Sequence, residues 1–170
     1  MEYILQDLID YITRAMSDIS MVDEDYGQLE MLDQQERYAY PLTYPAVLID
    51  APDANWTNDT GNNQRGTANI RIRLIIDCYD DTHSRRSGST DKVSEREEMR
   101  HRLHCLLQGY RIQDNQALNR TASRYYTWNH GIKVYEQTYT TMITETAEIK
   151  SMTAAIRPDL TVARLRVTAR

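Results

Sequence analysis

The chain has 170 residues, of which 41% are hydrophobic and 26% are charged, and its net charge at pH 7 is −5. One domain of this length can bury enough apolar surface to fold without disulfide bonds, and the composition excludes disordered and fibrous chains. The acidic balance argues against a general nucleic-acid binder, because such proteins use an excess of Lys and Arg to neutralise phosphates.

The N-terminal sequence and the two cysteines predict the compartment. The first residues include early acids and no basic stretch, and no apolar run approaches the roughly twenty residues that span a bilayer. We therefore expect a protein that works in a cytoplasm and does not enter a membrane. Cys78, on the apolar side of a predicted strand, and Cys105, on a predicted helix, are expected to be reduced core residues.

The first predicted element is an amphipathic helix from Glu2 to about Ser17. Its apolar stripe repeats at helical spacing and consists of Ile4, Leu8, Ile12 and Ala15. We expect this helix to cover one face of a sheet. Residues 17–45 have a weak pattern with several tyrosines and two prolines, which indicates an extended, loop-like stretch.

The next segments predict a short strand and a long loop. Val47, Leu48 and Ile49 form an apolar run typical of a buried strand over 46–50. Residues 53–66 are nearly all turn formers, whose side chains favour local bonds to the backbone over a strand ladder. We therefore predict a loop here, with Trp56 as the aromatic residue best placed to contact another chain.

A long strand from Thr67 to Asp80 is the strongest pattern in the chain. The apolar side chains that share one parity are Ala68, Ile70, Ile72, Leu74, Ile76 and Cys78. Polar and aromatic residues take the other parity, with Ile75 as the single exception. The alternation predicts one buried face and one exposed face, with Arg71 and Arg73 on the exposed face.

A second helix is predicted after a polar loop over 81–91. Ser94 and Glu97 match a capping box, which predicts the start of the helix, and Gly109 predicts its end. The expected buried stripe consists of Val93, Met99, Leu103, Leu106 and Leu107.

The last predicted elements form a hairpin. β-Branched and aromatic residues surround Asn129–Gly131 and predict arms at 123–128 and 132–144, with a bulge near Glu136 where the apolar parity switches. The complete pattern predicts a single α+β domain over residues 1–146, with a mixed, mostly antiparallel sheet and about two helices packed on one face. Residues 147–170 are interpreted as a C-terminal extension, an arm or a last strand.

Several potential metal ligands occur near the second helix. They are His101, His104 and Cys105, with Asp77, Asp80 and Asp81 at the end of the long strand. Asp77, Asp80 and His101 suggest a metal-dependent hydrolase or nuclease, because carboxylates can hold the ions that stabilise a phosphoryl transition state. However, His104 and Cys105 point in different directions from one helix, and acids that follow a strand are typical turn formers. We therefore predict no catalytic residue and no metal, and no nucleotide-binding motif predicts a cofactor.

Residues 1–145 resemble the tail-terminator, tail-completion and head–tail joining proteins of long-tailed bacteriophages and prophages. The resemblance rests on the order helix, short strand, polar loop, long strand, helix and hairpin, and on three local patterns. These patterns are the Trp56 loop, Gln64-x-Gly66 before the long strand, and Val-Tyr-x-x-Thr-Tyr in the second hairpin arm. Residues 17–44 and the segment beyond 147 depart from the family.

The resemblance implies a structural virion protein, not an enzyme, that is assembled in the host cytoplasm. Its implied form is a ring, commonly a hexamer, that ends the tail tube and meets the head connector. The implied partners are its own copies, the tail tube protein and the head–tail connector protein, with no membrane and no sequence-specific nucleic acid. The expected interface residues are Trp56, Gln64, Arg65, Arg71, Arg73 and Tyr79.

Two alternatives to a virion protein remain at this point. One is the metal-dependent hydrolase described above. The other is a host peptide-binding or scaffold module, in which an open sheet edge accepts an added strand.

Overall fold

A six-stranded mixed sheet forms the centre of the structure, a computed structural model that describes residues 1–32, 41–78 and 89–146. The spatial order is β1 (Met21–Glu24), β2 (Ala46–Ile49), β4 (Asn63–Asp77), β6 (Ile132–Thr146) and β5 (Asn119–Thr127), and β3 (Asp53–Asn58) pairs with β4 beyond β2. β1 and β2 run parallel, and all other neighbours run antiparallel. The predicted α+β class is confirmed.

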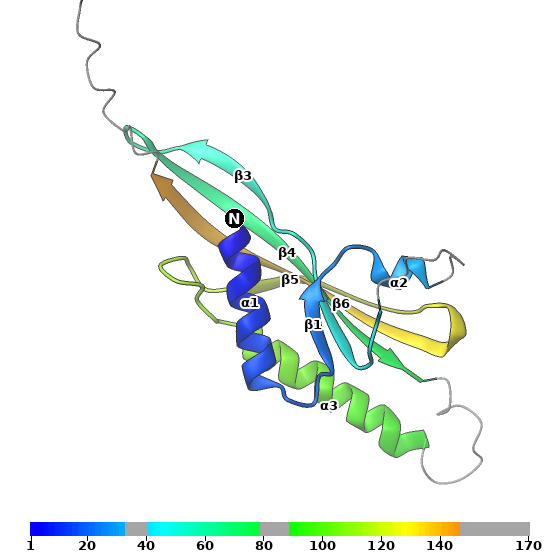
Figure 1. Cartoon of the computed structure of the whole chain (residues 1–170). Helices are drawn as coiled ribbons and strands as arrows, with labels where there is room; N and C mark the ends of the chain where they lie inside the picture. Colours follow the sequence, from blue (N-terminus) through cyan, green and yellow to red (C-terminus); the bar gives the residue numbers. More distant parts are fainter. Residues whose placement is uncertain (33–40, 79–88, 147–170) are drawn as a thin grey trace, which may run out of the picture.

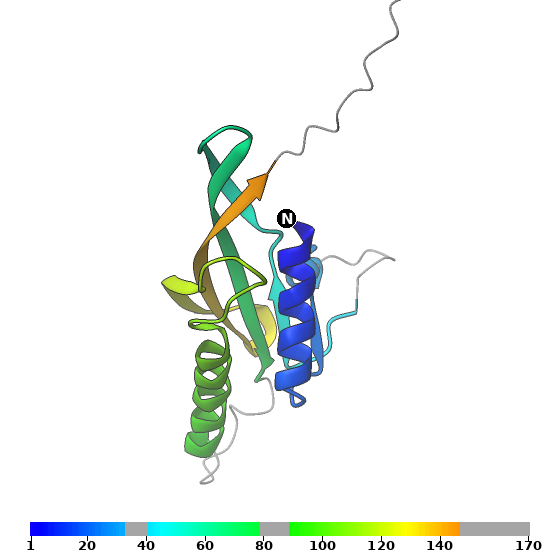
Figure 2. The same ribbon diagram turned by 90° about the vertical axis from the view of Figure 1, so that its left-hand side faces the viewer.

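Two helices cover one face of this sheet (Figure 1). α1 (Glu2–Ala15) and α3 (Ser89–Leu107) lie on the same side, and the turned view separates them (Figure 2). The core between helices and sheet includes Ile4, Leu8 and Ile12 from α1, Leu103 and Leu107 from α3, and Ala68, Ile70, Ile72 and Leu74 from β4. The amphipathic first helix and the buried parity of the long strand are therefore confirmed, except that Ala15, the last residue of the predicted stripe, is exposed.

A second, smaller core lies on the opposite face of the sheet. It joins Leu29 of the one-turn helix α2 (Gln28–Met31) to β2, β4 and β6. Ile75, the exception in the alternation of the long strand, belongs to this core together with Ile132 and Val134. Trp128 packs against it. β2 is buried on both faces, which explains why its sequence is a continuous apolar run.

The predicted loop over 53–66 is wrong, because this segment forms β3, a turn and the start of β4. Its polar side chains are compatible with strands because β3 is largely exposed. Trp56 lies directly opposite Gly66 in the ladder, and an added Cβ at Gly66 would approach Cε3 of that ring to 2.8 Å. The glycine therefore leaves the space that the indole ring occupies.

The predicted bulge near Glu136 is also wrong. β4 and β6 keep one continuous register from the Asn63 and Thr146 pair to the Asp77 and Ile132 pair. The apolar parity switches because the two ends of β6 face different cores, with Val134 in the smaller core and Tyr139 in the helix-covered core. The register shift that does occur lies in the β5–β6 ladder, between Arg120 and Ala122.

The second helix begins earlier than predicted. α3 starts at Ser89, so Ser94 lies inside the helix and is not its cap. The expected stripe is only partly correct, because Leu103 and Leu107 are buried whereas Val93 is 54% exposed. The predicted end is confirmed, since Gly109 follows with a positive φ of 84°.

Other differences concern the segment over 17–45 and the cysteines. That segment contains β1 and α2, and neither was predicted. Cys78 is buried as expected, but Cys105 is exposed. Tyr79, Asp80 and the expected C-terminal arm lie outside the described residues. Within the described ranges, no helix combines the length and apolar character needed to cross a bilayer.

Candidate functional site

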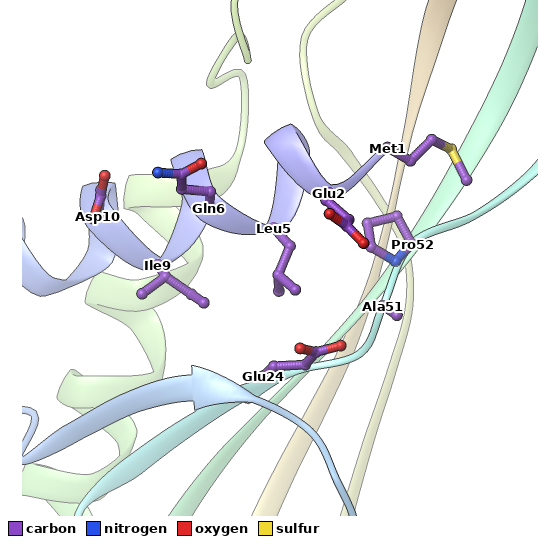
Figure 3. Close-up of a pocket in the computed structure, with 9 residues that line it drawn as sticks. All are labelled: Met1, Glu2, Leu5, Gln6, Ile9, Asp10, Glu24, Ala51 and Pro52. Carbon is purple, nitrogen blue, oxygen red and sulfur yellow. The ribbon is translucent and has the colours of Figure 1, made fainter.

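Three grooves on the described surface are candidates for binding. One of about 590 Å³ separates the start of α1 from Glu24 and the Ala51–Pro52 segment (Figure 3). A second, of about 490 Å³, lies between α3 and strands β5 and β6. The third, of about 320 Å³, lies on the sheet face opposite α1 and α3 and brings three arginines together. The face that holds the third groove contains the charged residues predicted from the sequence.

The sheet face opposite α1 and α3 is open to solvent except where α2 covers it. The side chains that the strand register assigns to it, which we call the open face, include Asp53, Asn55, Thr57, Arg65, Thr67, Asn69, Arg71, Thr138, Thr140, Met142 and Thr144. Each of these residues is exposed or half-buried. Most are threonine, asparagine or arginine, so the surface is polar and rich in hydrogen-bonding groups. Such a surface is stable in water and can also pair with another polar chain.

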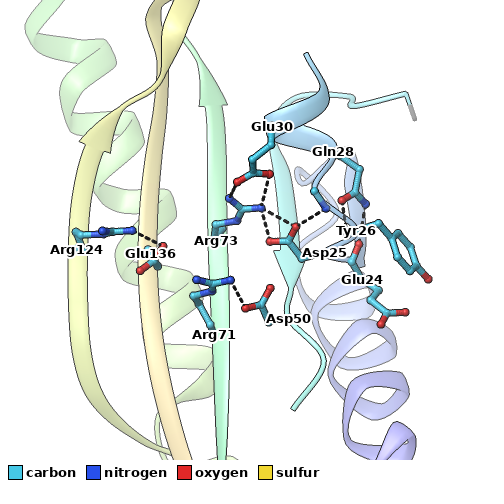
Figure 4. A network of polar contacts seen from close by, with 11 residues as sticks. Glu24, Asp25, Tyr26, Gln28, Glu30, Asp50, Arg71, Arg73, Arg124 and Glu136 are labelled. Atoms are coloured by element: carbon cyan, nitrogen blue, oxygen red, sulfur yellow. Dashed lines mark hydrogen bonds and ion pairs between the residues drawn. The ribbon is translucent and has the colours of Figure 1, made fainter. Parts of the chain in front are cut away.

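The prediction that Arg73 lies on the exposed face is wrong. Its side chain is 6% exposed and lies beneath the β1–α2 segment (Figure 4). Nη2 of Arg73 is 2.5 Å from Oδ2 of Asp25, and Nη1 is 2.5 Å from Oε1 of Glu30. The acids that pair with Arg73 therefore come from its own chain. The physical reason is that α2 folds over this end of the sheet and removes Arg73 from water.

The electrostatics of this cluster favour the charged forms. Burial by itself would lower the pKa of the Arg73 guanidinium, but the hydrogen bonds and charges of Glu30 and Asp25 outweigh burial and raise it. The hydrogen bond from Arg73 lowers the pKa of Glu30 despite its partial burial. Both partners therefore stay ionised at neutral pH.

A tight turn holds Asp25 in place for this contact. The N–H of Gly27, which has a φ of 86°, donates to Oδ1 of Asp25 at 3.0 Å. Gln28 is buried, its Nε2 donates to the carbonyl of Glu24 at 2.7 Å, and its Oε1 accepts from the N–H of Tyr26 at 2.7 Å. The Asp-Tyr-Gly sequence is a turn signal that could have indicated this bend. Nothing local indicated that the turn would face Arg73.

Two more exposed ion pairs complete the charged cluster. Arg71 pairs with Asp50, which follows β2, and Arg124 of β5 pairs with Glu136 of β6 at 3.0 Å (Figure 4). Burial raises the pKa of the Asp50 carboxyl, and the nearby Arg71 opposes that shift. The guanidinium of Arg124 also stacks over the ring of Tyr126, 4.8 Å from its centroid.

The other predicted interface residues are divided between the two faces. Arg65 shares the open face with Arg71 and pairs with Asp59 near the β3–β4 turn. Trp56 and Gln64 lie on the opposite side, where Trp56 packs against the helix-covered core. Tyr79 is outside the described residues. Contacts of these side chains with another chain stay a prediction.

The potential metal ligands of α3 point in different directions. Nδ1 of His104 is 3.0 Å from the hydroxyl of Tyr139, and that hydroxyl donates to Oε1 of Gln137 at 2.7 Å. His101 instead contacts the exposed Cys105, with Nε2 and Sγ 3.4 Å apart. Among the described residues, no group of three or more His, Cys, Asp or Glu could hold a metal ion. Asp80 lies outside those residues, so the proposed hydrolase set stays untested.

Comparisons with protein-family models and with curated protein sequences find no match. Among solved structures, the chain is similar to a chain of a structure described as the virion of a native gene transfer agent (GTA) particle. The two share 10% sequence identity with a TM-score of 0.48, and the similarity covers 82% of this chain and 90% of that chain.

Proposed function

We propose that this protein is a structural component of a phage-like virion, assembled as a ring that ends the tail tube and meets the head connector. The observation that carries the proposal is the open face. Strands β3, β4 and β6 form a ribbon that extends beyond α1 and α3 (Figure 1), and its polar side is not covered by the rest of the described chain. A surface of this kind is expected in a protein that works by contacting other chains.

The sequence resemblance supports the same proposal. It implies a ring, commonly of six copies, with the tail tube protein and the head–tail connector protein as partners and the virion as location. The arrangement of the sheet agrees with this implication, because β1 and β5 form two unlike edges. Unlike edges suit a head-to-tail contact between copies, and such contacts close into rings.

Gene deletion in the phage or prophage that encodes the chain tests the role. Without the protein, we expect electron micrographs of lysates to show heads without joined tails and tails of abnormal length. Supplying the wild-type gene in trans should restore complete particles. Normal tailed particles from the deletion strain would contradict the proposal.

Self-association tests the ring separately. Light scattering and native mass spectrometry across a concentration series should detect a closed oligomer of one defined size. A protein that associates without limit, or that never associates, would contradict the ring.

A further inference from the structure

Two grooves of unlike charge lie at opposite edges of the helix-covered side of the sheet. The acidic groove is formed by α1, β1 and the Ala51–Pro52 segment, at the β1 edge. The basic groove is formed by α3, β5 and β6, at the β5 edge. Neither groove contains any of the interface residues that were predicted from the sequence.

The acidic groove combines carboxylates with an apolar floor. Glu2 and Glu24 approach it from opposite sides, and Leu5 and Ile9 lie between them (Figure 3). Asp10 is a third acid that lines this groove. The α-amino group of Met1 is the one cation among the lining residues. Within the described part of the chain, the carboxylates of Glu2, Asp10 and Glu24 make no hydrogen bond or ion pair. These three acids are available to a cation from outside.

The basic groove combines guanidinium groups with exposed aromatic and apolar surface. On the helix-covered side its charged residues are Arg96, Arg100 and one acid, Glu97, which pairs with Arg100. Tyr125 stacks on Tyr135 with ring centroids 4.9 Å apart. Tyr125 is 55% exposed and Val93 is 54% exposed, so apolar surface lies in water beside the arginines. Tyrosine and arginine together are typical of the residues that contribute most to protein interfaces.

A buried polar group also points to a missing partner at the basic groove. Gln137 lines this groove and is 2% exposed. Its Oε1 accepts from the hydroxyl of Tyr139, but within the described chain its buried Nε2 has no acceptor. An unpaired buried donor is destabilising, so an acceptor supplied by a second molecule would stabilise this side chain.

We infer that the basic groove of one copy binds the acidic α1–β1 edge of the next copy, and that this contact is the interface that closes the ring. This inference rests on the proposed ring and names the surfaces that form it. A two-fold contact would oppose arginine to arginine, whereas a head-to-tail contact opposes arginine to carboxylate. The occupant is therefore a second copy of this chain.

Charge-reversal variants test the contact. The acidic-edge variant is Glu2→Lys with Asp10→Lys, and the basic-groove variant is Arg96→Glu with Arg100→Glu. All four residues are exposed or half-buried, so circular dichroism should show a folded protein. Each variant alone should need a concentration on the order of a hundredfold higher to associate, because like charges then face each other. Tyr125→Ser, which changes no charge, should also weaken association.

Mixing the two variants gives the decisive measurement. Lysines on one copy then face glutamates on the next, and the unchanged edge and groove face each other at the following contact. The equimolar mixture should therefore regain an oligomer of wild-type mass with alternating copies. Arg65→Glu with Arg71→Glu, on the open face, and Asp114→Lys with Glu145→Lys, which line neither groove, are matched controls and should associate as the wild type does.

The outcomes separate this inference from the proposed function. Rings of wild-type stability from both groove variants would overturn the inference and leave the proposed ring intact. A wild type that stays monomeric at every concentration would overturn the inference together with the ring. Restored rings in the mixture, combined with normal particles from the deletion strain, would support the inference and contradict the virion role.

Discussion

Arg73 is the residue that most directly joins separate parts of the chain. It is carried by the central strand β4, and its two acids come from the β1–α2 segment. Removing the guanidinium would leave Asp25, whose side chain is 3% exposed, charged and without its cation. Breaking a buried ion pair in this way costs more than the pair itself contributes, because the remaining charge stays desolvated.

We expect Arg73→Met to lower the free energy of unfolding by about 3–5 kcal/mol. Arg71→Met is the matched control, two residues away on the same strand. Its ion pair with Asp50 is exposed, so its loss should cost less than about 1 kcal/mol. Urea unfolding followed by tryptophan fluorescence measures both. Equal losses in the two variants would show that the Arg73 cluster is not the stabilising contact.

His104 should make stability depend on pH. Burial, followed by the nearby charges of Arg120, Arg100 and His101, lowers its pKa in the folded state. The unfolded chain, with a histidine pKa of about 6.5, then binds the proton more readily than the folded chain. Stability should therefore fall as the pH drops from about 6.5 towards the lowered pKa of the folded state.

Replacing the imidazole tests that dependence. His104→Gln should show a smaller loss of unfolding free energy between pH 7 and pH 5 than the wild type. His101→Gln, on the exposed side of the same helix, is the control and should keep most of the dependence, because burial is the main cause of the lowered His104 pKa. Identical pH profiles for the wild type and His104→Gln would rule out this histidine as the source.

At the scale of elements, the β3–β4 hairpin depends on one close contact between its strands. Gly66 and Trp56 are paired in the register, and the ring occupies the space that a side chain at position 66 would need. Gly66→Ala should lower stability by about 1–3 kcal/mol, because either the ring or the strand must shift. Thermal unfolding and the Trp56 contribution to fluorescence would report the change.

A double-mutant cycle separates this contact from the general cost of changing a glycine. In a Trp56→Leu background the position opposite residue 66 has no indole, so Gly66→Ala should cost much less. If Gly66→Ala lowered stability equally in both backgrounds, the loss would come from the backbone at position 66 and not from contact with the indole ring.

At the scale of the whole molecule, the open face and the two grooves have different expected roles. The grooves lie at the sheet edges on the helix-covered side, and the open face lies on the opposite side. Arg65→Glu with Arg71→Glu should leave self-association unchanged and reduce the yield of joined particles in complementation. In the proposed role the open face contacts the tube or connector, so reversed charge on it should weaken that contact and not the contact between copies. Full complementation by this variant would remove the open face from the joining function.

Local sequence patterns predicted much of the secondary structure. The alternation was confirmed from Thr67 to Ile72 but not at Arg73, the helical stripe of α1 was confirmed except at Ala15, and the hairpin arms β5 and β6 were confirmed. These predictions hold because periodic burial on one face appears directly in the order of apolar residues. The turns at Gly131 and Gly109 were predictable for a local reason as well. Both glycines have a positive φ, which other residues rarely adopt.

Only the tertiary structure decided which surfaces are covered. It placed Arg73 under α2, paired the polar residues of β3 with β4, and directed the two ends of β6 to different cores. The sequence contained both charged residues of each ion pair, but residues far apart in the chain meet only through strand pairing and packing. Local periodicity shows which residues share a face of a helix or strand. Long-range contacts decide which of the two faces is covered and which faces water.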